Sequence, residues 1–595
     1  MPFQSVRGIF PHMNTLSGWT GSVLHLDLTE KSVETRHPDL SVYTKYMGGK
    51  GLTGYYLRPH ATKEYTDPDL PVIIATGPLT GTAAPTSGRG TIMSRSPLTG
   101  AICDTSVGGR LATQLKQAGY DAIVITGMSD TPCGIEILDG DARIVPTQLG
   151  GTTTDTLFDQ LTPSLPNDAS IACIGPAGEN GSPMAAIMVD RHHAAGRGGL
   201  GMIWGAKNLK YLSVHGTGTV SVHDEDALTE AREEILRLTA ASPVLMGQHG
   251  FSCWGTGSLF DLMDSRRMMP TDNFARTRFE HAAELNAAAY KKRFSPTSHG
   301  CMGCHIRCKK TAQDGRNMPE FETMSHFTAL IGNTNMALVL TANDTCGKLG
   351  LDPVSAGATL ACRREITGED YTAESLLAAL HEMAEGGDLG QGSHTFAALC
   401  ERPEASMSVK GLELPAYDPR GAYGMALAYA TSTRGGCQLR AYPVSHEILR
   451  KPVATDRFSF SGKARIIKIA EDMNAVVDSL SACKFIFLAA SLEEYAKAYT
   501  AVTGVAVSGH TLLEIGERIY YNERIMNAAN GFDAADDDLP ERFFTEAGTS
   551  GGGITIAPID RDDFLTARQT YYRVRGLDQN GIPTPEKIEK LGLNR

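Results

Sequence analysis

The chain has 595 residues and a net charge of -12, with 42% hydrophobic and 21% charged residues, values ordinary for a soluble globular protein. At roughly 150 residues per domain, this length predicts two to four domains. The acidic balance argues against a nucleic-acid partner, which would favour basic patches, and no stretch reaches the ~18 apolar residues of a membrane-spanning helix.

The N-terminus carries no visible targeting signal. Residues 1–20 lack a basic segment followed by an apolar run, so the expected compartment is the cytoplasm. In that compartment the twelve cysteines are expected to be reduced thiols or metal ligands rather than disulfides. Met13 is a second candidate start, with residues 1–12 as an added or poorly ordered leader.

The first 216 residues alternate predicted strands with glycine-rich loops. Period-two alternation and short apolar runs predict strands at 18–36, 72–76, 91–94 and 122–126, with a helix at 110–118. The densest glycine loops are Gly48–Gly51, Gly77–Gly81, Gly108–Gly109 and Gly196–Gly201. Such glycines either make turns that need a positive φ or expose backbone N–H groups that bind an anion such as phosphate. Arg89 and Arg197 lie in or beside these loops and can add forked donors to a phosphate.

Beyond residue 216, helical patterns dominate. Helices are predicted at 223–238, 323–348, 373–385, 462–478 and 485–501. The first of these has acidic residues in its opening turns, which favour a helix N-terminus. We therefore place a domain boundary near residue 216, between a strand-rich domain and a helical remainder. The acidic run at 533–540 is predicted to be a solvated loop.

Three cysteines fall within eight residues, at Cys301, Cys304 and Cys308. Thiolates at this spacing can converge on one soft metal centre. A [4Fe–4S] cubane needs four cysteines, and a tight loop commonly supplies several of them. A further cysteine in a marked context is Cys483, which follows Asp478 closely. On spacing alone a structural zinc site stays open as the alternative, because four cysteines also suit zinc.

Taken together, these features resemble the aldehyde ferredoxin oxidoreductase family, the tungstopterin enzymes. The resemblance covers nearly the whole chain as an ordered set of motifs. In the first 216 residues the motifs are Gly48–Gly51, Gly77–Gly81, Ser87–Arg89, Gly108–Gly109, Gly196–Gly201 and Gly205–Lys210. Beyond them follow the cysteine trio, Pro319–Thr323, Gly350–Asp352, Asp418–Gly421, Gly424–Met425 and the pair Asp478 and Cys483.

The resemblance implies an α+β fold, with a β-rich N-terminal pterin-base domain at 1–216 and two mainly α-helical domains at 217–415 and 416–595. Family members hold one tungsten, sometimes molybdenum, through the dithiolenes of two pyranopterins. A [4Fe–4S] cluster passes electrons to ferredoxin or a partner subunit, a magnesium ion often bridges the pterin phosphates, and homodimers are common. The implied reaction is the oxidation of an aldehyde to a carboxylic acid.

The resemblance also implies which residues bind the cofactors. The cluster ligands would be Cys301, Cys304, Cys308 and Cys483. The other cofactor-binding residues would be Arg89, Ser106, Gly108, Ala195, Arg197, Gly198, Asp352 and Asp478. Arginine suits phosphate, and Asp352 and Asp478 can accept paired hydrogen bonds from an aminopyrimidine ring. Without the resemblance, these two aspartates would be interpreted as helix caps or turn residues.

The candidate catalytic residues are Glu320, Glu322, Gln438 and His446. A carboxylate near the metal can act as a general base if burial tunes its pKa. Glu320 and Glu322 both match the family's acidic motif, and the sequence does not decide which of them faces the metal. After Arg434–Cys437 the family commonly has a histidine, but this chain has Gln438, which donates a hydrogen bond and cannot titrate. His446 is a candidate substitute.

Gly347 is a second departure from the family pattern, because an Asp or Asn is expected there. Four interpretations of the function remain open. The leading one is ferredoxin-linked aldehyde oxidation, which the same centre can run in reverse. Gln438 favours an alternative, the reduction or other transformation of a different carbonyl or ring substrate. A third is a cluster-only electron-transfer subunit, but Arg89 and Asp478 argue against it, because an electron carrier needs no pterin cradle. A zinc-stabilised binding protein is the fourth.

Overall fold

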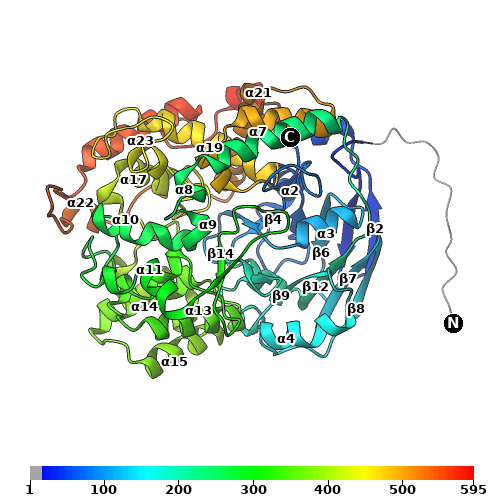
Figure 1. The fold of residues 1–595 in the computed structure, drawn as a ribbon. Coiled ribbons are helices and arrows are strands. Elements are labelled where there is room, and N and C mark those ends of the chain that lie inside the picture. Colours follow the sequence, from blue (N-terminus) through cyan, green and yellow to red (C-terminus); the bar gives the residue numbers. More distant parts are fainter. Residues whose placement is uncertain (1–15, 595) are drawn as a thin grey trace, which may run out of the picture.

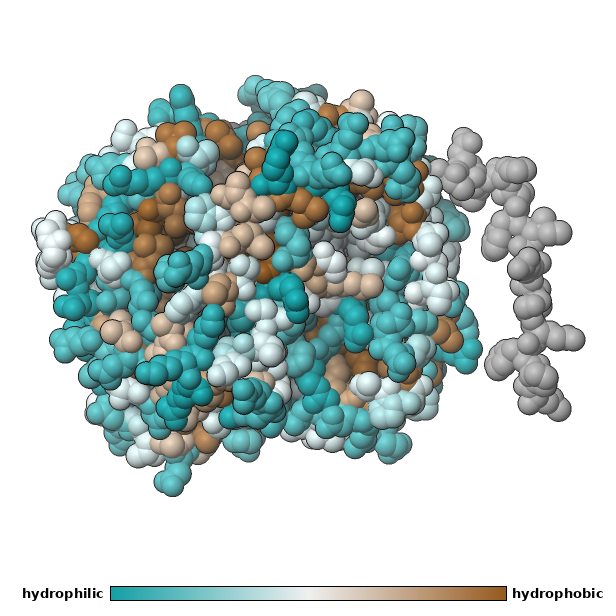
Figure 2. Space-filling view, viewed as in Figure 1, coloured by the Kyte–Doolittle hydropathy of each residue, from teal (hydrophilic) through white to brown (hydrophobic). Residues whose placement is uncertain are grey.

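The structure is a computed structural model that describes residues 16–594, so the proposed start at Met13 lies outside the described residues. Up to residue 216 the chain forms two six-stranded sheets, and beyond it the chain is mainly helical (Figure 1). The predicted α+β class is therefore confirmed. Within residues 16–594, no helix combines the length and apolar character needed to cross a membrane. Polar side chains cover most of the face seen in Figure 2, with apolar groups scattered between them.

The first sheet has the strand order β2-β1-β6-β3-β4-β5. Its strands are β1 Val23–Asp27, β2 Ser32–Arg36, β3 Val72–Ala75, β4 Gly90–Arg95, β5 Ile102–Val107 and β6 Ala122–Thr126. β1 and β6 pair in parallel, whereas the other neighbours in this sheet are antiparallel. All of β3 is buried, as expected for an apolar run in the interior of a covered sheet. β5 ends at the Gly108–Gly109 loop, which lies at the site described below.

The second sheet has the strand order β11-β10-β9-β12-β7-β8. Its strands are β7 Cys133–Leu138, β8 Asp141–Pro146, β9 Ser170–Ile174, β10 Ile187–Val189, β11 His193–Ala195 and β12 Leu209–His215. The edge strand β11 contacts β5 of the first sheet. β11 leads directly into the Gly196–Gly201 loop, so the two sheets present their glycine loops to the same region.

The helical half wraps around this double-sheet base (Figure 1). The helices of six or more residues are α1 Leu40–Tyr46, α2 Gly49–Leu57, α3 Leu111–Gln117, α4 Thr154–Leu161, α6 Leu200–Ala206, α7 Glu225–Ala240, α10 Leu259–Ser265, α11 Ala287–Phe294, α12 Phe321–His326, α13 Met336–Leu349, α14 Pro353–Thr367, α15 Ala373–Ala384, α16 Ser393–Leu399, α17 Tyr423–Thr431, α19 Lys463–Ser479, α20 Leu492–Thr503, α21 Gly509–Ala529, α23 Arg561–Arg575 and α24 Pro585–Lys590. One continuous apolar core joins the two halves.

The prediction of one helix at 323–348 is wrong, because the structure has two helices there, α12 and α13. α12 ends at His326, and a short 3-10 turn stops at Gly332, whose φ of 71° terminates the helical path. Asn335 then caps α13, because its side chain accepts hydrogen bonds from the backbone N–H groups of Ala337 and Leu338. This break separates the catalytic candidates from the long helix that follows them.

The acidic run at 533–540 is not simply a solvated loop. Asp537 is fully buried, and its carboxylate lies 2.7 Å from Lys410 Nζ and 2.9 Å from Arg524 Nη1. The hydroxyl of Tyr572 donates a third contact at 3.0 Å. The prediction failed because an acidic run usually faces water, whereas here two buried cations from distant segments require a counter-charge.

We predict that Asp537→Asn lowers the stability of the fold by about 3–5 kcal/mol, because it leaves two buried cations without their counter-charge. The matched control is Asp533→Asn in the same run, where the side chain is exposed and only accepts from the Ala535 N–H. The midpoint of thermal unfolding should fall by several degrees in the first variant and stay near wild type in the second. Equal midpoints in both variants would show that the buried ion pairs contribute little.

Two glycines of the N-terminal loops allow the chain to approach the end of α19 closely. A Cβ on Gly49 would lie 2.1 Å from the carbonyl oxygen of Asp478, and one on Gly77 would lie 2.3 Å from the carbonyl of Leu480. No side chain fits at these distances, so glycine is required for backbone packing at both positions. These contacts fix the segment that leads from α19 to Cys483.

Candidate functional site

A cavity of about 300 Å³ lies between the two halves of the chain. Its walls from the β-rich half include Thr86, Arg89, Gly108, His193 and Ala194. From the helical half come the four predicted cluster cysteines, both candidate glutamates and Gln438, namely Cys301, Cys304, Cys308, Cys483, Glu320, Glu322 and Gln438. Residues separated by almost 400 positions in the sequence thus face one enclosed space, the kind of concave site in which ligands bind.

The four cysteines reach this cavity from two segments. The cluster loop, residues 301–308, joins β13 Thr297–His299 to β14 Lys309–Thr311. It is held against the base because the Met302 N–H donates to the Gly109 carbonyl at 3.2 Å. The Cys483 N–H donates to the Thr86 carbonyl at 3.0 Å, which brings the second segment to the same wall. Burial raises the pKa of Cys483 to about 11, so this thiol is neutral near pH 7 unless a metal centre binds it as a thiolate.

Arg89 and Gly108 line the cavity next to the cysteines. Arg89 Nε donates to the Ser106 hydroxyl at 2.8 Å, and its Nη2 donates to the Ser106 carbonyl at 2.6 Å. Ser106 therefore orients Arg89 and does not itself line the cavity. A Cβ at Gly108 would lie 2.4 Å from Cys301 Sγ, so only glycine allows the cluster loop to close over this strand end.

Arg197 and Asp352 lie together outside the cavity lining. Arg197 Nε is 3.1 Å from Asp352 Oδ2, and its Nη2 donates to the Glu413 carbonyl at 2.6 Å. Asp352 also caps α14, because its carboxylate accepts hydrogen bonds from the N–H groups of Val354 and Ser355. In this structure Asp352 is therefore a helix cap, the alternative given for it above. Arg197 Nε has no aligned hydrogen-bond partner, so it retains an unused donor.

Two further predicted residues of the same loop also lie off the cavity. Gly198 has φ +83°, and a Cβ there would meet Cys103 Sγ at 2.3 Å, so the position requires glycine for packing. Ala195 is buried in β11, where it pairs with Ile187, and its neighbour Ala194 lines the cavity instead. Both residues shape the loop rather than face the cavity.

Asp478 approaches the site through Lys484. Lys484 Nζ, which lines the cavity, forms an ion pair with Asp478 Oδ2. The other carboxylate oxygen, Oδ1, is buried and has no hydrogen-bond partner. A buried carboxylate oxygen without a partner is costly, so this atom is available to accept a hydrogen bond from a bound group. Asp478 lies inside α19 and caps no helix.

Glu322 and Gln438 form a pair on the cavity wall. Gln438 Nε2 donates to Glu322 Oε1 at 2.6 Å, and the Ala416 N–H donates to Oε2 at 2.8 Å. Burial raises the pKa of Glu322 to about 7, although the two hydrogen bonds lower it in part. A carboxylate with a pKa near neutrality can both accept and release a proton at physiological pH.

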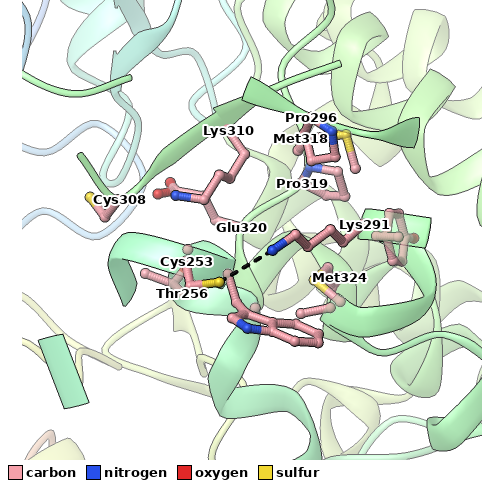
Figure 3. A pocket seen from close by; sticks show the side chains of 15 residues that line it. Cys253, Thr256, Lys291, Pro296, Cys308, Lys310, Met318, Pro319, Glu320 and Met324 are labelled. Carbon is pink, nitrogen blue, oxygen red and sulfur yellow. Dashed lines mark hydrogen bonds between the residues drawn. The ribbon is translucent and has the colours of Figure 1, made fainter. Parts of the chain in front are cut away.

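Glu320 has a different environment from Glu322. Its Oε2 lies 2.8 Å from Lys309 Nζ, and although burial raises the pKa of Glu320, Lys309 brings it below the usual value. Glu320 and Cys308 also border a second, smaller cavity next to Lys291 and Cys253 (Figure 3). Glu320 is therefore held as an ion-paired carboxylate, which makes it a weaker base than Glu322.

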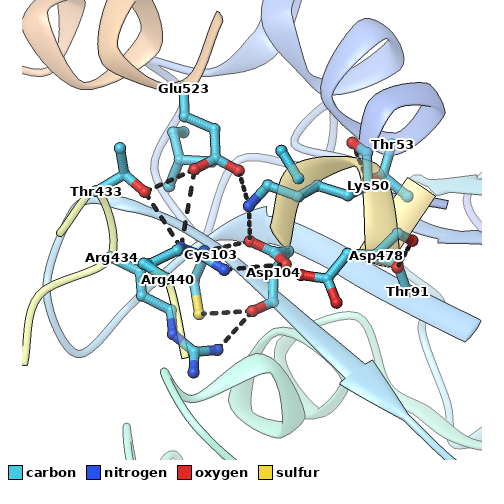
Figure 4. A network of polar contacts seen from close by, with 12 residues as sticks. Lys50, Thr53, Thr91, Cys103, Asp104, Thr433, Arg434, Arg440, Asp478 and Glu523 are labelled. Carbon is cyan, nitrogen blue, oxygen red and sulfur yellow. Dashed lines mark hydrogen bonds and ion pairs between the residues drawn. The ribbon is translucent and has the colours of Figure 1, made fainter. Parts of the chain in front are cut away.

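A buried network of charges positions the loop that carries Gln438 (Figure 4). Asp104 of β5 pairs with Arg440 and lies 3.0 Å from Lys50 Nζ, and Lys50 in turn pairs with Glu523. Arg434 donates to the Asp104 carbonyl at 2.7 Å. Burial raises the pKa of Asp104, but Arg440 and Lys50 more than offset this and hold it well below its usual value. The loop is thus fixed on both sides of Gln438.

His446 does not line the cavity. Its Nδ1 lies 3.1 Å from the Val453 carbonyl, a contact within its own surface segment. Several residues that line the cavity were not predicted from the sequence: Lys309, Lys484, Tyr417, Tyr442, Phe485 and Phe487. The two lysines directly follow predicted cluster ligands, which is a usable signal. The aromatic residues carry no such signal, because aromatic side chains are also common in cores.

The match to known proteins covers almost the whole chain. Residues 23–216 match the N-terminal domain of the aldehyde ferredoxin oxidoreductase family, and residues 230–593 match its domains 2 and 3. The tungsten-containing aldehyde ferredoxin oxidoreductase of Pyrococcus furiosus is 34% identical, over 96% of this chain and 98% of that protein. The enzyme of the same name from Thermococcus kodakarensis is also 34% identical, with the same coverage of both chains.

Two further matches have other substrates in their names. A protein of Pyrococcus furiosus described as an aliphatic sulfonate oxidoreductase, WOR-like subunit, is 26% identical over 97% of both chains. A solved complex of benzoyl coenzyme A reductase, BamBC, has the same fold, with a TM-score of 0.82, 22% identity and 97% coverage of each chain. These matches and the cavity define the chain as an oxidoreductase. More narrowly, it belongs to the aldehyde ferredoxin oxidoreductase family.

Proposed function

We propose that this protein is a tungsten or molybdenum bis-pyranopterin enzyme that oxidises an aldehyde and passes the electrons through a [4Fe–4S] cluster to ferredoxin. One aldehyde and one water give one carboxylic acid, two protons and two electrons, and the ferredoxins accept the electrons. The observation that carries the proposal is the cavity itself. Four cysteines from two segments, the Arg89 cation and a glutamate with a pKa near 7 line it together.

The donor set of the cavity fits these groups. The cluster would be held by Cys301, Cys304, Cys308 and Cys483, which line one wall. Within the described residues, no three His, Cys, Asp or Glu side chains converge on a point that could hold a single metal ion. A zinc site would place its sulfurs about 2.3 Å from one ion, whereas a cubane spreads its ligands over four irons, and the iron and zinc contents distinguish the two.

The pterins would be held by other residues of the site. Arg89 supplies a cation, and Asp478 Oδ1 is a buried acceptor without a partner. Arg197 and Asp352, which pair with each other outside the cavity lining, provide a second cation and carboxylate. A magnesium ion at the pterin phosphates stays a prediction. When bound, the metal centre supplies the two-electron acceptor for the reaction.

The residues of the chain provide the acid–base part of the reaction. Glu322, as a carboxylate, takes the proton from the water that adds to the carbonyl carbon. Gln438 holds Glu322 Oε1 by a 2.6 Å hydrogen bond, in the position where a histidine is common in the family. Gln438 orients the base and transfers no proton, because an amide does not titrate in this range.

The pH dependence of turnover provides a test of this arrangement. Because Glu322 must be deprotonated to act, kcat/KM should rise with pH, with an apparent pKa of about 7. In Gln438→Ala the carboxylate loses a hydrogen bond that favours its charged form, so this midpoint should move upward by about one pH unit. Kinetics between pH 5.5 and 9 measure both curves. If the midpoint stays unchanged in Gln438→Ala, the hydrogen bond from Gln438 does not influence the pKa of Glu322.

A second candidate is a reaction on a different carbonyl or ring substrate, run as a reduction or another transformation. The observation that favours it is that Gln438 shares the cavity lining with four aromatic residues, Tyr417, Tyr442, Phe485 and Phe487. The names of the two further matches include substrates other than aldehydes. A substrate panel distinguishes the two, because aldehyde-dependent viologen reduction should be absent under the second candidate.

Elemental analysis of anaerobically purified protein tests the proposal first. We expect about one tungsten or molybdenum and about four irons per chain, the content of one mononuclear site and one cubane. Aldehydes should then reduce a viologen dye in the presence of the loaded protein. Iron without tungsten or molybdenum, in protein from a host that makes the cofactor, would reject a pterin enzyme in favour of an electron carrier. Zinc in place of iron would reject both.

A further inference from the structure

The surface over the cluster loop is unusually basic for this chain. Residues 285–313 carry six Lys or Arg and no Asp or Glu, although the whole chain has a net charge of -12. The neighbouring stretch 241–260 contains no Lys, Arg, Asp or Glu, and 480–491 contains only Lys484. These three stretches next to the predicted cluster carry seven positive and no negative side chains.

Part of this charge faces solvent. Lys291, Lys292 and Arg293 form the exposed end of α11, and Arg307 is exposed within the cluster loop. Arg307 Nη2 donates to the Ser298 carbonyl at 2.6 Å, so its position relative to the loop is fixed. The remaining cations are engaged inside: Lys309 with Glu320, Lys310 with backbone carbonyls and Lys484 with Asp478.

The basic helix end and the cluster loop lie beside each other. Lys291 and Cys308 line the same small cavity, with Cys253 between them (Figure 3). Lys291 Nζ lies 3.2 Å from Cys253 Sγ and 5.5 Å from the centre of the Trp254 ring, which directs it toward the loop. The end of α11 thus belongs to the rim around the cluster.

The centre of this surface is apolar and open. Met302, between two predicted ligands, is 40% exposed, and Met246 on the nearby α8 Pro243–Met246 is 38% exposed. A Cβ at Gly303 would meet nothing within 4 Å, so the tip of the loop faces open space. An exposed apolar centre with a charged rim is the usual layout of a protein interface, and this one lies directly over the cysteines.

We propose that this surface, centred on Met302 and rimmed by Lys291, Lys292, Arg293 and Arg307, is the docking site for an acidic iron–sulfur electron carrier. The proposal rests on the proposed function, because it assigns the exit of the electrons to one face of the chain. Carboxylates of the carrier would meet the basic rim, and its cluster would approach the loop at Met302. A carrier at this face exchanges one electron at a time with the cluster and forms no covalent bond.

Charge reversal at the helix end tests the surface. In Lys292→Glu/Arg293→Glu, kcat/KM for reduction of a purified acidic [4Fe–4S] ferredoxin should fall about tenfold at low salt, because the rim attracts the carrier. The neutral variant Lys292→Gln/Arg293→Gln should lie between this and wild type. The differences should shrink in ~1 M salt, where the Debye length is only about 3 Å. Reduction of a small viologen dye by the same variants should stay near wild type.

A matched control reverses charge elsewhere. Lys45→Glu/Arg143→Glu changes the net charge equally at two exposed positions on other surfaces, and should leave ferredoxin reduction near wild type. Binding of oxidised ferredoxin, followed by calorimetry, gives a readout that needs no turnover. A zero-length carbodiimide, which joins carboxylates to lysines, should link the ferredoxin to Lys291 or Lys292.

The outcomes separate the two proposals. Loss of aldehyde-dependent viologen reduction in the wild type contradicts the proposed function, while binding and cross-linking still test the surface. Cross-links that map to lysines on another face overturn the docking site. The docking site is also overturned if ferredoxin does not bind at low salt. The same holds if the two double charge reversals have equal effects on binding.

Discussion

Glu322→Gln is expected to lower aldehyde turnover by about 10²–10⁴-fold, the usual contribution of a positioned general base. Glutamine has nearly the same shape and can still accept one hydrogen bond, from the Ala416 N–H or from Gln438. The fold and both cofactors should therefore persist, so that the loss reflects missing base chemistry. Viologen-coupled rates measure the loss of turnover, and the tungsten, molybdenum and iron contents show whether both cofactors persist.

The matched control is Glu320→Gln, two residues away on the same wall. Glu320 is paired with Lys309 and its pKa is lowered, so it is already a poor base near pH 7. We expect its replacement to reduce turnover by less than about tenfold, a smaller effect than the loss of a general base. Wild-type rates in both variants would discard the assignment of a base to this motif. A larger loss in Glu320→Gln than in Glu322→Gln would exchange the two roles.

The sequence could locate these two glutamates but could not rank them. Both follow the cluster loop in a short motif, and nothing in the spacing distinguishes their environments. The difference arises from Lys309, which reaches Glu320, and from Ala416 and Gln438, which reach Glu322 from about a hundred residues away. Partners at such separation are a product of the fold, so the pKa of each carboxyl could not be derived from its own neighbours in the chain.

The fold itself was predicted best where local signals agree. The strands at 72–76 and 122–126 and the helix at 462–478 appear as β3, β6 and α19, because an apolar run or a clear helical period identifies each of them. The helix at 323–348 was split by Gly332, whose positive φ is invisible in hydrophobic periodicity. Asp537 was misplaced because its burial depends on Lys410 and Arg524, which lie far from it in sequence.

The glycine loops illustrate a further limit. Their composition allowed either an anion cradle or a simple turn, and the structure adds a third use at Gly49 and Gly77. There the missing side chain lets the backbone pack against Asp478 and Leu480. At Gly108 the missing side chain instead leaves room for the Cys301 sulfur. Close approach of two backbones requires knowledge of the tertiary fold, so sequence composition alone could not separate this role from ligand binding.

Cys483→Ala is expected to remove or convert the cluster while the chain still folds. The side chain faces the cavity, and the contact that fixes this segment is the backbone N–H of residue 483 donating to the Thr86 carbonyl, which alanine retains. Three cysteines in the loop cannot complete a cubane that needs four. Iron content should drop below about four per chain, the content of a cubane, and the electron paramagnetic resonance signal of the reduced cluster should be lost or changed.

Cys253→Ala is the matched control, because Cys253 borders the smaller cavity beside Cys308 but does not line the main one. Its iron content and cluster signal should match the wild type. An unchanged [4Fe–4S] signal in Cys483→Ala would refute the fourth-ligand assignment. Tungsten or molybdenum content adds a second conclusion, because Asp478 and Lys484 flank the same turn. If iron is lost and tungsten or molybdenum stays, the two cofactors bind at this turn independently of each other. Loss of both would show that binding of both cofactors depends on Cys483.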